Sequence, residues 1–369
     1  MRRAGPWPDM AASRVVHLVG RVTDQVFSFL GPATSALADS GVEQSVVLLD
    51  DLRFRHLLPR FHDSVELVLI PVERNPLRHW RQLRKAFRDV LEGGPLKAVH
   101  LHGLLPCLMG ASFARSSHLA APLYFSLHGS KSLRPPTNLA HSILRVLRTL
   151  FGTSNQRGIA NIPAETRTLS AMTRQAVELV ESPVADVFFR VKRNEARYPL
   201  IVTGNRIDNP RSAELFAQLA VLLGGETLRL SFNWIGTADA GSMVRLKAAN
   251  VGVFDVTNDQ QRAARLAAGW VYLAPGGTRG FPLFLVEAMA VGLPCVAVDT
   301  DNHRDVIRHG ETGFLCRTET EILHCIAQLI DVRALRMRIG QAAREEAQHR
   351  FSGMTFRDSL FAAYGMEAP

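Results

Sequence analysis

The sequence is poor in cysteine and has no long apolar run. Its four cysteines among 369 residues form no Cys-x-x-Cys pair, so neither a disulfide framework nor a clustered metal site is expected, and all four are predicted to be buried, reduced thiols. No apolar run approaches the roughly 18 residues that a membrane-spanning helix requires. Residues 1–13 lack the apolar core of a signal peptide, and we expect a disordered lead-in without export.

The sequence also lacks a dinucleotide-binding fingerprint. Residues 15–19 are predicted to form a buried strand, a helix follows over about 27–40, and residues 45–49 form a second strand, which is a Rossmann-like opening. The loop after the first strand carries only Gly20, where the fingerprint Gly-x-Gly-x-x-Gly needs three glycines. This absence argues against an enzyme that uses a nicotinamide cofactor.

The length suggests two domains of ordinary size, and the charge is unevenly divided between the halves of the chain. The net charge is +9, of which residues 1–185 carry +8 (22 Lys+Arg against 14 Asp+Glu) and residues 186–369 carry +1 (21 against 20). An excess of one sign in one half suggests an anionic partner for that half. The alternative is an arginine-rich composition without functional meaning.

Residues 76–92 are predicted to form an amphipathic helix. Apolar residues recur at spacings of three and four on one side. The remaining surface carries five basic residues, namely Arg78, Arg81, Arg84, Lys85 and Arg88. Such a helix could lie on an anionic membrane surface. Alternatively, its apolar stripe faces the protein core and its basic face is solvated.

Histidines stand at the ends of two predicted strands. The strand over 97–101 runs into His100-Leu-His102-Gly, and the strand over 122–127 ends at His128. Ligands bind at the carboxyl ends of strands in open α/β sheets, which makes His128 a candidate binding residue. His100 and His102 could form a metal pair, but two residues on one strand with no nearby third ligand are a weak signal.

The most informative stretch is residues 270–298, which reads as strand, glycine-rich loop, helix, proline break and strand. The run from Val271 to Ala274 suits a buried parallel strand, and the helix covers about 283–290. Backbone N–H groups at the start of such a helix form an anion site. Glu287 lies about one turn inside the helix. The N–H groups could bind the diphosphate of a nucleotide and the carboxylate could bind its ribose, so together they would recognise a nucleotide.

This stretch resembles the C-terminal signature of the retaining GT-B glycosyltransferases, particularly the large family 4. That family has Glu-Gly-Phe-Gly/Pro, four further residues, and then Glu-Ala-Met-Ala-x-Gly-x-Pro-Val-Val-Ala. Here residues 280–282 are Gly-Phe-Pro and residues 287–297 are Glu-Ala-Met-Ala-Val-Gly-Leu-Pro-Cys-Val-Ala. In the family the first Glu contacts the transferred sugar and the second binds the ribose. Arg279 replaces the first, and Glu287 matches the second.

The resemblance continues outside the signature and implies the site residues. Arg206 matches an arginine that grips the donor diphosphate, and Arg211 stands where many members have a lysine with the same role; in members with Pro-Arg-Lys, Ser212 takes that place. The implied catalytic residues are His128, Arg206, Arg211 and Glu287. The implied donor-binding residues are Gly20, Asn205, Val256, Arg279, Gly280, Phe281, Pro282, Leu283 and Phe284.

The resemblance covers nearly the whole chain and implies the GT-B fold, an α/β architecture of two Rossmann-like domains facing across a cleft. The expected parts are an N-terminal acceptor domain over 14–189, a linker over 190–198, a nucleotide-sugar domain over 199–350 and a C-terminal helix over 351–369 that crosses back to the first domain. Other predicted elements are a strand over 65–72, helices over 106–119 and 138–151, a turn and helix starting at 168 and running to about 181, and final helices over about 319–330, 333–350 and 354–364.

The implied activity is transfer of a sugar, with retention of configuration, from a UDP- or GDP-sugar co-substrate to a glycan or lipid-linked acceptor, in bacterial cell-surface polysaccharide or lipopolysaccharide synthesis. No metal, other cofactor or nucleic acid is expected. The protein would be cytoplasmic, with a possible peripheral place at the anionic inner face of the membrane.

Two departures from the family pattern leave another class of function open. Arg279 reverses a charge in the donor motif, and residues 300–307 replace a loop that usually reads Gly-Gly-x-Pro-Glu. Both favour a nucleotide-sugar-binding protein with weak or no catalysis. A GT-B sugar epimerase is a third alternative, but it would require acid–base carboxylates that the sequence does not place.

Overall fold

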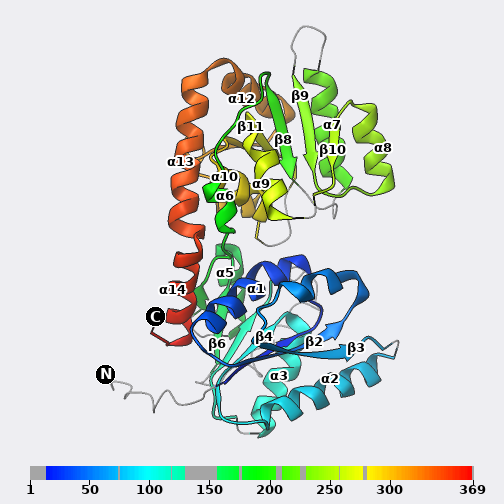
Figure 1. The fold of residues 1–369 in the computed structure, drawn as a ribbon, viewed down its shortest axis with the longest axis vertical. Helices are drawn as coiled ribbons and strands as arrows, with labels where there is room; N and C mark the ends of the chain where they lie inside the picture. The colour runs from blue at the N-terminus through cyan, green and yellow to red at the C-terminus, as the bar shows by residue number, and fades with distance from the viewer. Residues whose placement is uncertain are drawn as a thin grey trace. The chain divides into compact units, whose positions relative to one another are not determined.

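The computed structural model of the chain is drawn in Figure 1. The residues that it describes are 14–73, 75–117, 119–128, 156–173, 177–204, 210–224, 230–256, 258–276 and 281–367. The described chain divides into two compact units. The first contains the residues up to Val180 and those from Arg357, and the second runs from Glu181 to Phe356.

The first unit is built on a parallel sheet in the order β3-β2-β1-β4-β5-β6-β7. Its strands are β1 (Arg14–Val19), β2 (Gln44–Asp50), β3 (Val65–Pro71), β4 (Leu96–His102), β5 (Leu123–Ser126), β6 (Gln156–Ala160) and β7 (Val177–Leu179). The order reverses between β1 and β4, as in a Rossmann domain. The central strands are largely buried because helices cover both faces of a parallel sheet, and most of their buried residues are apolar.

The amphipathic segment forms helix α2 (Pro76–Leu91), for which the sequence left two alternatives, an apolar stripe that faces the core or a helix that lies on an anionic membrane surface. Leu83, Phe87 and Leu91 are buried in the hydrophobic core of the first unit. All five basic residues of the segment are exposed. These three apolar residues therefore face the core, whereas the basic residues meet solvent. The other helices of this unit are α1 (Asp24–Asp39), η1 (Leu52–Arg60), α3 (Leu104–Ser117) and α5 (Pro163–Thr173).

The second unit repeats the same topology with the strand order β10-β9-β8-β11-β12-β13. Its strands are β8 (Leu200–Gly204), β9 (Ser231–Ile235), β10 (Gly252–Phe254), β11 (Val271–Ala274), β12 (Cys295–Val298) and β13 (Phe314–Cys316). Its helices are α6 (Asp186–Arg190), α7 (Pro210–Leu223), α8 (Ala240–Ala248), α9 (Asp259–Ala267), α10 (Leu283–Val291), α11 (Asp301–Arg304), α12 (Glu319–Asp331) and α13 (Arg333–Phe351). Helix α14 (Gly353–Tyr364) begins here and ends in the first unit.

The segment expected to be a linker is hydrogen-bonded to the second unit. The N–H groups of Asn194 and Ala196 donate to the carbonyl groups of Ala267 and Ala268, at 3.0 Å each. The Arg193 guanidinium donates to the backbone carbonyls at 292 and 269, at 2.8 and 2.9 Å. These bonds fix residues 193–196 against the loops that follow α9 and α10.

Two local predictions are wrong. The helix expected to reach 181 ends at Thr173, and Val177–Leu179 forms strand β7 instead. This strand pairs with β6, where Gly158 leaves room for the Val177 side chain, so tertiary pairing overrides the helical pattern. The 3₁₀ helix η1 forms where no element was expected. The predicted helix over 138–151 lies outside the described residues.

Other predictions are confirmed. The final helices lie within two residues of their expected bounds, at 319–331, 333–351 and 353–364. All four cysteines are buried and free. Within the described ranges, no helix is both long and apolar enough to cross a bilayer.

Helix α10 is held by a close backbone contact with α13. It ends at Gly292, whose φ of 86° forms the left-handed cap that stops a helix. A Cβ atom added at Gly340 of α13 would lie 2.4 Å from the Gly292 carbonyl oxygen. Glycine at 340 therefore lets the two helices approach and sets the position of α10.

We expect Gly340→Ala to destabilise the protein by about 1–3 kcal/mol, because either the α10 cap or α13 must shift to relieve the clash. Chemical denaturation measures the free energy of unfolding. Gly353→Ala is the matched control, since nothing lies within 4 Å of an added Cβ there. Equal stability of the two variants would contradict the proposed contact.

Candidate functional site

A pocket in the second unit lies at the carboxyl ends of β8 and β11. These two strands flank the reversal of strand order, which is where open α/β sheets bind ligands. The start of α10 forms another wall. The lining residues are Gly204, Tyr272, Ala274, Pro275, Gly276, Pro282, Phe284, Leu285 and His303.

The inner wall of the pocket is a tight contact between backbone and aromatic rings. A Cβ atom at Gly204 would lie 2.7 Å from the Phe284 ring, so only glycine leaves room there. The Tyr272 hydroxyl donates to the Gly204 carbonyl at 3.1 Å. Burial raises the pKa of Tyr272 well above its usual value. Tyr272 is therefore a neutral hydrogen-bond donor that fixes the end of β8.

The N-terminus of α10 offers an anion site to this pocket. Pro282 is the N-cap residue, no side chain caps the helix, and the first turn carries no acidic residue. Pro282 and Phe284 both line the pocket. The N–H groups of the first turn and the positive end of the helix dipole favour a phosphate at such a place.

Glu287, one turn inside α10, is buried and paired with a residue that sequence reasoning missed. Both of its carboxylate oxygens accept hydrogen bonds from the Arg262 guanidinium, at 2.7 Å each. Arg262 also donates to Asp259 at 2.8 Å and lies over the Phe284 ring, 5.4 Å from its centre. Burial lowers the pKa of Arg262, but the two carboxylates outweigh burial and raise it above its usual value. Arg262 is thus always charged.

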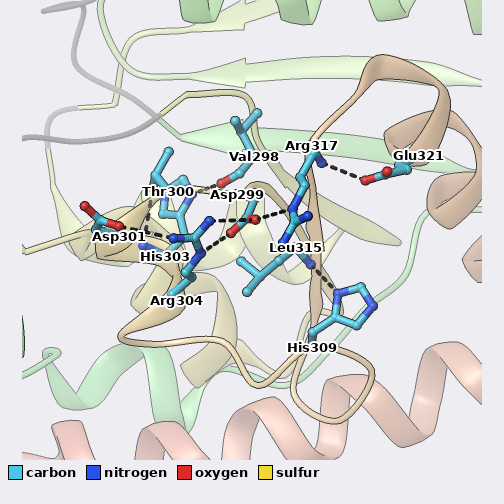
Figure 2. A network of polar contacts seen from close by, with 10 residues as sticks. All are labelled: Val298, Asp299, Thr300, Asp301, His303, Arg304, His309, Leu315, Arg317 and Glu321. Carbon is cyan, nitrogen blue, oxygen red and sulfur yellow. Dashed lines mark hydrogen bonds and ion pairs between the residues drawn. The ribbon is translucent and has the colours of Figure 1, made fainter.

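The corner between β12 and α11 is held rigid by an ion-pair network (Figure 2). Asp299 accepts from Arg304 at 2.6 and 2.9 Å and from Arg317 at 3.0 Å. The hydrogen bonds from Arg304 and then from Arg317 lower the pKa of Asp299 to about 2. The side chain of Thr300 caps α11. A short, pinned helix therefore stands where the family usually has a glycine-rich loop.

The same corner orients His303 at the pocket. Its Nδ1 lies 2.6 Å from the Val298 carbonyl oxygen, which can only accept, so the proton is on Nδ1 and Nε2 is an acceptor. Burial lowers the pKa of His303, which keeps the ring neutral. His303 was not singled out from the sequence.

The other expected donor-site residues are scattered or lie beyond the described ranges. Arg211 is exposed in the first turn of α7, and Val256 is half-buried after β10. Phe281 packs against the Phe351 ring, with centroids 5.5 Å apart. Gly20 follows β1 in the first unit. The residues that lie outside the described part are Asn205, Arg206, Arg279 and Gly280.

The first unit contains a buried group of four histidines. His17 Nδ1 lies 3.1 Å from His102 Nε2, and His102 Nδ1 lies 2.9 Å from His128 Nε2. His100 lies beside His102, with ring centroids 4.0 Å apart. The sequence predicted no third metal ligand near His100 and His102, and this prediction is wrong. Strand β1 pairs with β4 and places His17 opposite His100. Candidate ligand atoms of these three residues lie within 4.8 Å of one another.

Burial keeps this histidine group neutral. It lowers the pKa of His17 to about 4 and that of His128 to about 3. Burial, and then the neighbouring imidazoles, lower the pKa values of His100 and His102 well below the usual range. His128 also has a left-handed backbone, with φ of 51°, at the end of β5. Such strain in a residue other than glycine is typical of functional positions.

Two glycosyltransferase family profiles match this chain, one mainly in each unit. The profile of glycosyl transferases group 1 matches residues 245–346, and that of the glycosyl transferase 4-like domain matches residues 31–185. The chain therefore belongs to the group 1 glycosyltransferases.

Two curated relatives illustrate the range of similarity. The phosphatidyl-myo-inositol mannosyltransferase of Mycobacterium tuberculosis strain H37Rv is 27% identical over 68% of this chain and 67% of its own length. The N-acetyl-alpha-D-glucosaminyl L-malate synthase of Bacillus anthracis is 34% identical over 24% of each chain. The matched segments thus span between about a quarter and two thirds of these relatives.

Solved structures share the fold at low sequence identity. Anabaena HepE in complex with UDP has a TM-score of 0.76 and 16% identity, over 95% of this chain and 99% of that one. Sucrose-phosphate synthase from Thermosynechococcus elongatus has a TM-score of 0.71 and 16% identity, over 95% and 98%. The protein has the GT-B fold, as predicted.

We expect Arg262→Met to destabilise the protein by about 3 kcal/mol, because it leaves the buried Glu287 carboxylate without its partner. The double variant Arg262→Met/Glu287→Gln should recover part of this loss, since a neutral amide is cheaper to bury. Denaturant titration measures all three proteins. Arg190→Met, which breaks an exposed pair with Asp186, is the control and should change stability by less than about 0.5 kcal/mol. A similar change in both single variants would refute the importance of the pair.

Proposed function

We propose that this glycosyltransferase moves a sugar, with retention of configuration, from a nucleotide-sugar donor to a glycan or lipid-linked acceptor. One observation carries the proposal: the uncapped start of α10 opens on the pocket at the ends of β8 and β11, and the buried Glu287 lies one turn inside the same helix. The structurally similar HepE is known with UDP and with UDP-glucose, which supports a nucleotide-sugar as the donor.

The proposed chemistry combines the start of α10 with residues whose roles the family resemblance implies. The helix N-terminus stabilises the leaving diphosphate, and Arg206 and Arg211, which match family residues that grip it, neutralise its negative charge, so no metal or further cofactor is required. The Glu287 oxygens accept from Arg262, and in the family that the sequence resembles the matching glutamate binds the ribose hydroxyls. The leaving phosphate deprotonates the acceptor, and His128 binds the donor sugar in the transition state.

The acceptor class is proposed from charge and from the names of the relatives. The phosphatidyl-myo-inositol mannosyltransferase acts, by its name, on a lipid. Helix α2 of this chain exposes five basic residues. A lipid-linked acceptor at an anionic membrane surface fits both the name of this relative and the basic residues of α2. Such an acceptor is also compatible with the synthesis of a bacterial cell-surface glycan.

A nucleotide-sugar-binding protein with little catalysis is the second candidate. The ion pairs that pin α11 where the family usually has a glycine-rich loop favour it. The deciding experiment incubates the protein with UDP- and GDP-sugars and measures release of nucleoside diphosphate with and without glycan or lipid acceptors. Release that depends on an acceptor supports the transferase, whereas tight binding without release supports the second candidate.

Arg211→Ala and Glu287→Ala should each weaken the binding of UDP or GDP about tenfold or more, because each removes a charge-assisted hydrogen bond worth about 1.5–3 kcal/mol. Isothermal calorimetry measures the affinity, and circular dichroism verifies that each variant is folded. Arg333→Ala is the control, since Arg333 is also exposed in the first turn of a helix, α13. Unchanged affinity in both test variants would refute the assignment.

We expect the protein to bind vesicles of anionic lipid but not neutral ones, and added salt should release it. The contact must be electrostatic because the apolar stripe of α2 is buried, and each basic residue near such a surface contributes about 1 kcal/mol. Flotation of vesicles measures the bound fraction. The variant Arg81→Gln/Arg84→Gln should bind more weakly, whereas Arg245→Gln/Lys247→Gln in the second unit should not. Equal binding to both vesicle types would exclude this role.

A further inference from the structure

The first unit contains a buried histidine chain, namely His17, His102 and His128 joined in that order by two hydrogen bonds. The resemblance gives a role to His128 alone. The other two are fully enclosed in the first unit, His17 on β1 and His102 at the end of β4. Their distances of 3.1 and 2.9 Å are those of ordinary hydrogen bonds.

Counting protons limits the chain to two arrangements. A neutral imidazole has one N–H and one acceptor nitrogen, and both nitrogens of His102 are engaged. His102 therefore donates to one neighbour and accepts from the other. Donation runs either toward His17 or toward His128 along the whole chain. The low pKa values of these buried rings exclude an extra proton at neutral pH.

The two arrangements differ at the two terminal atoms of the chain. These are His17 Nε2 and His128 Nδ1, and both are buried without a hydrogen-bond partner among the described residues. If donation runs toward His128, its Nδ1 carries a hydrogen and is a donor. If donation runs toward His17, the Nδ1 of His128 is an acceptor. The direction thus decides what His128 can bind.

Gln44 decides the direction. Its Nε2 donates to the Thr34 carbonyl at 2.8 Å, which orients the amide and leaves its acceptor Oε1 buried and unpaired. Parallel pairing of β1 with β2 places Gln44 opposite Val15 and Val46 opposite His17, so Gln44 and His17 lie on the same face of neighbouring strands. An amide oxygen can only accept, so His17 can satisfy it only with an N–H. Since His17 Nδ1 already faces His102, this N–H is on Nε2, the other buried and unpaired atom. The effect of Gln44 on the pKa of His17, which it raises against burial, agrees with this direction.

We propose that Gln44, His17 and His102 are positioning residues that hold His128 with its proton on Nε2, so that its Nδ1 accepts a hydrogen bond from a hydroxyl of the donor sugar. In this order His128 donates to His102, His102 donates to His17, and His17 donates toward Gln44. The sugar as ligand rests on the proposed function, whereas the proton order rests on the contacts within the first unit.

His100 lies next to the chain but has a fixed orientation of its own. The Ser126 hydroxyl donates to the Ile159 carbonyl at 2.6 Å, so it must accept from His100 Nε2 at 3.0 Å. His100 Nδ1 then accepts from the Tyr364 hydroxyl at 2.7 Å. A metal held by His17, His100 and His102 would have to replace hydrogen bonds that these rings already make.

Nitrogen NMR of the full chain labelled in histidine tests the proton order without substrate. His128 and His102 should both carry the proton on Nε2 at neutral pH. Gln44→Met removes the deciding oxygen at similar size, and His128 should then populate both tautomers. Gln156→Met is the matched control, because Gln156 is also a buried glutamine at the first position of a strand and also has an unpaired oxygen. It should leave His128 unchanged.

A proton on Nδ1 of His128 in the wild type, or an unaltered tautomer in Gln44→Met, would overturn the proposal. If Gln44→Met does not fold, His17→Phe breaks the chain at the same end and should give the same mixture. Stoichiometric binding of Zn²⁺ or Co²⁺ that shifts the signals of His17, His100 and His102 together would also overturn it, in favour of a metal site.

Kinetics connect the tautomer to the sugar. Gln44→Met should lower kcat about two- to tenfold, the effect of losing one neutral hydrogen bond, with unchanged affinity for UDP or GDP. An unchanged kcat in a variant with mixed tautomers would overturn the role of Nδ1 toward the sugar. Absence of turnover in the wild type with every nucleotide sugar would instead refute the proposed function, which the NMR result does not depend on.

Discussion

Parallel pairing of every strand that the structure describes is the constraint on which both units depend. Parallel neighbours must be joined by crossovers that pass over a face of the sheet, so helices bury both faces and the central strands become apolar. Only at the strand ends are loops and side chains left uncovered by helices, so that they can contact a ligand. The pocket of the second unit therefore lies at the ends of β8 and β11, and His128 stands at the end of β5. The reversal of strand order leaves space for a ligand at that edge.

The buried Glu287 of the second unit and the buried histidines of the first are held by partners that decide their charge. A carboxylate buried like Glu287 would cost several kcal/mol unpaired, and Arg262 supplies both a charge and a matching pair of N–H groups. The histidines of the first unit meet the same requirement without charge, by pairing donors and acceptors in sequence. The two units thus solve the burial of polar groups in different ways, with fixed charge in one and oriented neutral rings in the other.

The rigid corner at Asp299 and the close approach of Gly292 and Gly340 have a common consequence. Both fix elements that line or support the pocket, the first through ion pairs and the second through backbone contact. Binding is favoured when donors and dipoles are held in place before the ligand arrives, because no ordering then has to occur on binding. The exposed basic face of α2 is different, since long side chains in solvent act through summed charge at long range.

The sequence by itself determined the Rossmann-like halves, the burial of the cysteines and the strand–loop–helix around Glu287. These follow from local patterns, namely apolar runs of strand length, helix periodicity and the residues that start or stop a helix. The site residues that sequence analysis assigned at 205, 206, 279 and 280 stay predictions. Only the tertiary structure decided the pairing of Arg262 with Glu287, 25 residues apart, the strand at Val177–Leu179 and the meeting of His17 with His102. Strand alternation places His100 and His102 on one face, but the register between β1 and β4 brings His17 to them. Register and helix packing arise from contacts between distant segments, which no local pattern contains.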